Sequence, residues 1–166
     1  WNGGSFQAEQ QEFLKHQLGF RPMLIRLYNQ IQYSFFNHAN AKSVVIGKEE
    51  YLYEENYIKA HCGFDYIGQD KIKEKVRKMQ AVSDTLETLG TKMIYVFTPG
   101  KGSFYSEYLP DDYAGIKAEA TNIEGYRNEM KGKKLRNLDF HAWFSAMKDT
   151  ARYPFFPKTG IHWSKY

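Results

Sequence analysis

The chain has 166 residues, which is the length of one domain with a single buried core. Its formal net charge is +4, but its lysines are scattered among acidic residues, whereas nucleic-acid binding needs a clustered basic face with stacking rings, so we expect no nucleic-acid partner. The single cysteine, Cys62, excludes an intrachain disulfide, and no apolar stretch approaches the ~20 residues that cross a bilayer.

Two helices are predicted in the first 42 residues. A polar, glutamine-rich stretch over 5–18 is typical of a helix, which Gly19 would end. Pro22 suits the first turn of a second helix. The apolar positions of that helix recur at helical spacing: Leu24, Leu27, Tyr28, Ile31 and Phe35. We therefore assign residues 1–42 to an N-terminal helical segment and 43–166 to an α/β domain, which together form one domain.

Short strands and one long helix follow residue 42. A β-branched strand is predicted over 43–47, and a turn with a second strand over 48–53. The long helix is predicted over 69–89, and Gly90 is its natural stop. Its expected buried stripe consists of Ile72, Val76, Met79, Val82, Leu86 and Leu89.

Two further strands are predicted after this helix. The apolar run 93–97, between a helix and Pro99, is typical of a buried parallel strand. A third strand is predicted over 135–140, followed by a short helix over 143–150.

The alternation of these elements predicts a three-layer, flavodoxin-like α/β fold with a mainly parallel sheet. Three strong strands are few for such a sheet, which usually has about five. A sheet that ended here would leave an unpaired edge. We therefore expect the sheet to be incomplete at the C-terminus and the natural polypeptide to continue past Tyr166.

Ligands of open α/β sheets bind beyond the carboxyl ends of the strands. Three segments are predicted to meet there: the loop 98–105, Asp139 with His141, and the segment 153–164. The first loop contains Gly-Lys-Gly-Ser, but its register differs from that of a P-loop. It is either a tight turn or a binding loop, in which Lys101 would contact an anion and Tyr105 would face a sugar.

His162 is the main catalytic candidate. Aromatic and apolar neighbours flank it, and two prolines and a glycine constrain the approach to it. A histidine held in this way suits general-base catalysis, although a loop histidine between Ile and Trp, taken alone, is more often structural. The five histidines lack metal-ligand spacing, so no metal site is predicted. A triad of Ser103, His162 and Asp139 is conceivable, but no Gly-x-Ser-x-Gly surrounds Ser103.

Three blocks of the sequence resemble one known family. The run 45–53 (VIGKEEYLY) resembles the "IGKDGWLF" opening of the SGNH-hydrolase-like family of alginate and related polysaccharide O-acetyltransferases. The run 95–101 (YVFTPGK), with Tyr105 and Leu109-Pro110, is similar to that family's Pro-x-Lys block. The run 159–164 (TGIHWS) is similar to its Asp-Thr-His-Trp catalytic segment.

This resemblance implies a three-layer SGNH-like domain, of which residues 43–166 would be the N-terminal part. It implies acyl transfer through an acetyl-serine, without metal or organic cofactor. His162 would be the base, and the serine would lie in a later Gly-x-Ser block that this chain lacks, as in a truncated copy. The expected substrate-binding residues are Lys101, Tyr105, Thr159 and Trp163.

One position departs from the family pattern. Gly160 stands where the family has an aspartate two residues before the histidine. Loss of that carboxylate can lower the rate by about four orders of magnitude. Either Asp139 orients the imidazole, or Thr159 helps, or the site is weakened. The last case favours a rival function, a non-catalytic carbohydrate-binding or polysaccharide-assembly domain. A plain esterase is a third possibility.

The resemblance also indicates a cellular context. A cell-surface polysaccharide would be the substrate, and a membrane protein would deliver the acetyl donor. We expect a periplasmic or extracellular location. Because the chain opens at Trp1 rather than at a methionine, we expect that an N-terminal signal or anchor has been removed.

Overall fold

A computed structural model describes residues 5–17, 19–116 and 118–165. The chain divides into two compact units, Trp1–Lys42 and Ser43–Tyr166. Among the described residues, no helix is long and apolar enough to cross a membrane.

The first unit contains both helices predicted there, α1 (Ser5–His16) and α2 (Arg21–Phe36). Residue 18, at the end of the first predicted helix, lies outside the described residues. Pro22 stands in the first turn of α2, as predicted. The helix ends at Asn37, which has a left-handed φ of 48°, and the His38 N–H donates to the Gln32 carbonyl at 3.1 Å.

The second unit begins with a hairpin. Strands β1 (Val44–Ile46) and β2 (Leu52–Glu54) pair antiparallel, with Val45 opposite Tyr53. Their connection is a single 3₁₀ turn, η1 (Lys48–Glu50), in which Glu49 and Glu50 have φ values of 51° and 64°. Tight hairpins prefer two such left-handed residues because their twist matches that of the strands, but glutamate adopts this conformation at a cost.

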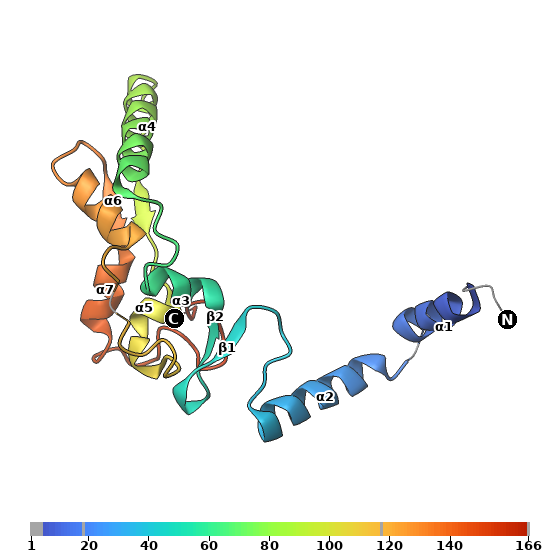
Figure 1. Cartoon of the computed structure of the whole chain (residues 1–166). Coiled ribbons are helices and arrows are strands. Elements are labelled where there is room, and N and C mark those ends of the chain that lie inside the picture. Colours follow the sequence, from blue (N-terminus) through green and yellow to red (C-terminus); the bar gives the residue numbers. More distant parts are fainter. Residues whose placement is uncertain (1–4, 18, 117, 166) are drawn as a thin grey trace. The chain divides into compact units, whose positions relative to one another are not determined.

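A first core lies beneath this hairpin. It contains Tyr53, Ile58, Cys62 and Leu109. Helices α3 (Glu55–His61) and α5 (Lys101–Phe104) pack against each other and against β2 (Figure 1). Gly102 permits this contact, since a Cβ there would lie 2.6 Å from the Tyr57 carbonyl oxygen. A 3₁₀ turn, η2 (Ser106–Tyr108), follows α5.

A second core lies between helices α4 (Gln69–Thr88) and α6 (Asn122–Met130). It contains Ile72, Val76, Met130 and Leu135. The predicted stripe of α4 is therefore correct in its first half, but Val82 and Leu89 are exposed. With nine residues, α6 is too short to cover the 20 residues of α4, whose later half projects beyond it (Figure 1).

Strands β3 (Tyr95–Phe97) and β4 (Asn137–Asp139) form a parallel pair, with Val96 opposite Leu138. Tyr95 and Phe97 pack against the second core, whereas Val96 is 46% and Leu138 47% exposed. The predicted burial of this strand is thus wrong, because only one face of the pair is covered. The described residues form one antiparallel and one parallel pair, so a mainly parallel sheet is not confirmed.

Helix α7 (Phe140–Met147) begins three residues before the predicted one. Asp139 caps it, because its carboxylate accepts a hydrogen bond from the Ala142 N–H at 2.8 Å.

Candidate functional site

Two hollows adjoin the carboxyl end of the parallel strand pair. Tyr57, Thr98 and Pro99 line both of them. The first has a volume of ≈ 270 Å³ and is completed by Phe156, Ile161, His162 and Trp163. The second, of ≈ 230 Å³, includes Ser103 and His141. The three segments predicted to meet at this edge therefore meet around Thr98 and Pro99.

His162 is exposed on the wall of the first hollow. The structure gives its imidazole no hydrogen bond or ion pair with any residue in the described ranges. Its neighbour Trp163 is 41% exposed, and the indole contacts the tilted ring of Phe144, at 5.6 Å between ring centroids. A partly exposed aromatic ring that other rings hold in place is a suitable platform for a sugar ring.

The backbone around His162 is a closed loop. The Ser164 N–H donates to the Phe155 carbonyl at 2.6 Å, and the Ser164 hydroxyl donates to Pro154 at 3.0 Å. Within the loop, the Gly160 N–H donates to the Pro157 carbonyl at 3.3 Å. These bonds hold the ends of the loop together on either side of the histidine.

Lys101 joins this loop to the hairpin. Its side chain is fully buried, with 0% exposure. The ammonium donates to the carbonyl of Leu52 on β2 at 2.8 Å, and the same group reaches three carbonyls of the His162 loop: Pro157 at 2.8 Å, Lys158 at 2.8 Å and Gly160 at 2.9 Å. The rings of Tyr51 and Tyr53 lie 5.2 and 5.3 Å from the nitrogen, within cation–π range. Burial lowers the pKa of Lys101 to about 8.

This environment corrects the predicted role of Lys101. A lysine ammonium has three N–H donors, and four backbone carbonyls surround this one. None of its donors is left for an anionic substrate. Lys101 instead sets the position of the loop that carries His162.

Tyr105 also lies elsewhere than predicted. Its half-buried ring packs against Phe104 at 4.7 Å and Tyr51 at 5.4 Å, and the Lys148 ammonium lies 5.0 Å from the ring centroid. It lines neither hollow described above. Tyr57 on α3 lines both of them, and no sequence pattern had distinguished it from the other tyrosines. Thr159 is exposed in the His162 loop.

The carboxylate of Asp139 binds partners other than His162. Its carboxylate accepts hydrogen bonds from Arg127 at 2.5 and 2.8 Å and from the Ala142 N–H. The Arg127 guanidinium holds the pKa of Asp139 below its ordinary value. Asp139 is thus not placed to orient His162 as predicted, because its acceptor positions serve Arg127 and the start of α7.

The triad of Ser103, His162 and Asp139 is not assembled. Ser103 lines the second hollow, together with His141, whereas His162 lines the first. The pKa of His141 is lowered, mainly by burial and then by Arg127, which favours the neutral imidazole.

Gly160 is sterically constrained. A Cβ at this position would lie 2.5 Å from Cγ of Pro157, well inside van der Waals contact. An aspartate at position 160 therefore requires the Pro157 ring or the 157–160 turn to shift. Within the described ranges, no group of three or more histidine, cysteine or acidic side chains could hold a metal ion.

Comparison with known proteins identifies the class. Residues 44–166 match the family model described as the SGNH hydrolase-like domain of the acetyltransferase AlgX. The chain therefore belongs to this family of SGNH hydrolase-like acetyltransferase domains, and its fold is SGNH-like.

Two curated relatives are similar to the chain. The probable alginate O-acetylase AlgJ of Pseudomonas syringae pv. tomato is 27% identical over 139 residues, which cover 83% of this chain and 33% of that protein. The protein of the same name from Pseudomonas putida is 27% identical over 136 residues, covering 81% and 33%. The chain thus spans about a third of the length of these relatives.

A solved structure supports the fold. The O-acetyltransferase domain of Pseudomonas putida AlgJ matches with a TM-score of 0.55 and 20% identity, over 74% of this chain and 41% of that one.

Proposed function

We propose that this chain contributes the histidine of a Ser-His site that transfers acetyl groups to, or removes them from, a cell-surface polysaccharide. The observation that carries the proposal is the position of His162. It lies on a hollow with two aromatic platforms, Tyr57 and Trp163, and on a loop that Lys101 anchors. Family membership and the names of the relatives, alginate O-acetylases, support the same chemistry.

In the proposed mechanism the nucleophilic serine comes from outside residues 1–166. His162 removes the proton of the serine hydroxyl as the oxygen attacks the acetyl carbonyl of the donor. The donor's acyl bond breaks, the leaving group takes a proton from the imidazolium, and an acetyl-serine forms. His162 then deprotonates a sugar hydroxyl or a water molecule, which attacks the acetyl-serine and regenerates the serine. The mechanism needs no metal or organic cofactor.

The substrate-binding roles follow from exposure. Trp163 and Tyr57 would stack on sugar rings, and the exposed hydroxyl of Thr159 would donate to or accept from a sugar hydroxyl. The family resemblance implies a membrane protein that supplies the acetyl group, and we propose that partnership, with a periplasmic or extracellular location, for this protein.

A second function is favoured by Gly160 and Asp139. The usual orienting carboxylate is absent at position 160, the packing against Pro157 opposes its return, and Asp139 is held by Arg127. These features suit a carbohydrate-binding or polysaccharide-assembly domain without catalysis. In that case the aromatic hollow would bind sugars, and His162 would serve only as a polar contact.

The test compares acetyl-ester hydrolysis by residues 1–166 and by the natural full-length protein, each with its His162→Ala variant. The proposal expects activity in the full-length protein alone, lowered by about 10²–10⁴-fold in the variant, as for loss of a general base. Full activity in the variant would refute it. Sugar binding without hydrolysis, in folded full-length protein, would establish the second function. Activity of residues 1–166 that Ser103→Ala abolishes would place the serine within this chain.

A further inference from the structure

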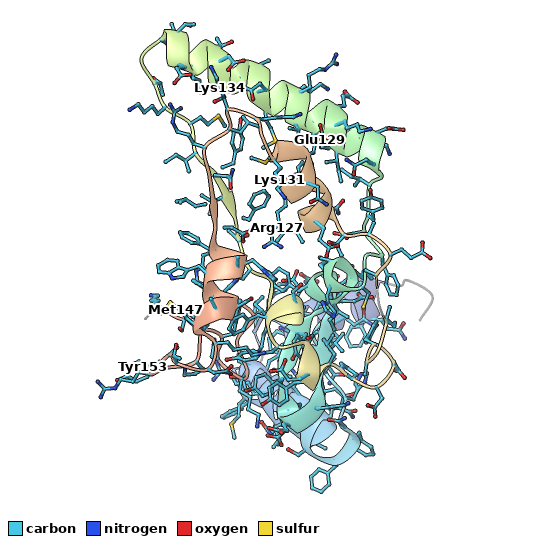
Figure 2. All side chains as sticks on the ribbon, turned by 90° about the vertical axis from the view of Figure 1, so that its left-hand side faces the viewer. Arg127, Glu129, Lys131, Lys134, Met147 and Tyr153 are labelled. Atoms are coloured by element: carbon cyan, nitrogen blue, oxygen red, sulfur yellow. The ribbon has the colours of Figure 1, made fainter. Side chains whose placement is uncertain are left out.

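A third hollow, which is cationic, lies near the C-terminal end of α6. It has a volume of ≈ 730 Å³, which falls within the range of about 300–1,000 Å³ typical of ligand pockets. Helix α4 and the turn after α6 form its walls. Figure 2 shows Glu129, at the end of α6, and Lys134, in that turn, beside α4. We call it the α4–α6 hollow.

The α4–α6 hollow carries an excess of positive charge. Four cations line it, namely Lys73, Arg77, Lys133 and Lys134, against only two carboxylates. Lys133 pairs with Glu129 at 3.1 Å, and Asp84 accepts a hydrogen bond from Gln80 at 2.7 Å. Among the described residues, the side chains of the other three cations have neither an ion pair nor a hydrogen bond. Because these like charges lie close together and repel one another, an anion bound here would be attracted by all three.

The lining limits the chemical class of that anion. No aromatic ring lines the hollow, so it offers no platform for nucleobases. Arg77 can bind a carboxylate through two parallel N–H bonds, and the lysines add point charges. Gln80 and the carboxylate of Asp84 can exchange hydrogen bonds with hydroxyl groups. A polymer that carries both carboxylates and hydroxyls matches this set, and such a polymer is a polysaccharide of uronic acids.

Helix α6 connects this hollow with the site of His141. Asn122 and Ile123, at the beginning of α6, line the hollow of His141, and Glu129, near its end, lines the α4–α6 hollow. Nine residues at 1.5 Å rise give a helix of about 13 Å. A chain of a few sugar units can span that distance, so one polymer can contact both hollows.

We propose that the α4–α6 hollow is an accessory binding site for a carboxylated polysaccharide. The site rests on the proposed function, in that this polymer is the acceptor or donor of the acetyl group. The accessory site raises the local concentration of sugar units at the hollow of His141 and at the adjoining hollow of His162, which share Tyr57, Thr98 and Pro99. Binding at one end makes binding at the other intramolecular.

The test measures the affinity of the full-length protein for an oligomannuronate by titration calorimetry at low and physiological salt. Three cations of the hollow are neutralised together in Lys73→Gln/Arg77→Gln/Lys134→Gln. The matched control, Lys71→Gln/Lys75→Gln/Lys92→Gln, removes the same charge from exposed positions outside the hollow. Glutamine retains the helix propensity of lysine and arginine. We expect about tenfold weaker binding in the first variant, at most about twofold in the control, and weaker binding at high salt in the wild type.

Equal losses in both variants would overturn the proposal, because they would reflect net charge alone. Undetectable binding to wild-type protein would overturn it as well. So would equal affinity for polyglutamate or for a DNA duplex, since the hydroxyl contacts would then contribute nothing.

The His162→Ala variant separates this proposal from the proposed function. It should keep most of the oligomannuronate affinity, because the α4–α6 hollow is unchanged, while losing acetyl-ester hydrolysis. If the wild type binds the oligomannuronate but does not hydrolyse acetyl esters, only the catalytic proposal is refuted. If it hydrolyses acetyl esters but does not bind the oligomannuronate, only the accessory site is refuted.

Discussion

Replacement of Lys101 by methionine tests the anchor of the His162 loop. Of the four carbonyls that the ammonium binds, two keep another partner, since Lys158 accepts from the Leu52 N–H at 2.9 Å and Pro157 accepts from the Gly160 N–H. The carbonyls of Leu52 and Gly160 lose their donor. Each unsatisfied buried carbonyl costs about 1–3 kcal/mol. This loss of stability is partly offset, because methionine carries no charge to bury. Burial of the Lys101 cation is unfavourable, as its pKa, lowered to about 8, indicates.

We therefore expect Lys101→Met to lower the free energy of unfolding by about 1–3 kcal/mol. Urea unfolding measures this change, and amide hydrogen exchange should show lost protection in residues 157–164 before the rest of the unit. The matched control is Lys92→Met, which removes an exposed lysine of the same chain. If Lys101→Met unfolds at the same urea concentration as this control and protects the loop equally, the four hydrogen bonds do not hold the loop and the reasoning fails.

Three more substitutions test other features. Asp139→Asn keeps an N-cap for α7 but weakens the pair with Arg127. Because the pKa of Asp139 is lower in the folded chain than in the unfolded one, the pair's stability is present above about pH 4 and is lost as pH falls through the folded pKa. Urea midpoints from pH 3 to 7 should therefore differ most at neutral pH, by about 1.5–3 kcal/mol, and converge in acid. Gly160→Asp should destabilise the chain by about 1–3 kcal/mol through the clash with Pro157 and should not raise esterase activity; unchanged stability would contradict the packing seen here. Glu50→Gly should stabilise the chain by about 1 kcal/mol in thermal unfolding, since glycine adopts the left-handed conformation freely, and a loss of stability would show that the turn differs.

Local patterns in the sequence were sufficient for most elements. Helical spacing and Pro22 located α2, and the apolar run before Pro99 located β3. These predictions succeed because they depend on periodicity and on the conformational limits of glycine and proline, which act within a few residues. Burial was predicted less well. Val82 in the later half of α4 and Val96 in β3 are apolar but exposed, since burial depends on how far a partner element extends.

The candidate site shows the same division. The sequence by itself determined that a histidine in a constrained, aromatic loop follows the strands, and it determined the family through three short motifs. Only the tertiary structure decided what the neighbouring residues do. Lys101, expected to contact substrate, is buried among carbonyls from two distant segments, and Asp139 is held by Arg127. Such roles depend on the direction of a side chain and on the acceptors that long-range folding places around it, and neither is encoded in the spacing of neighbouring residues.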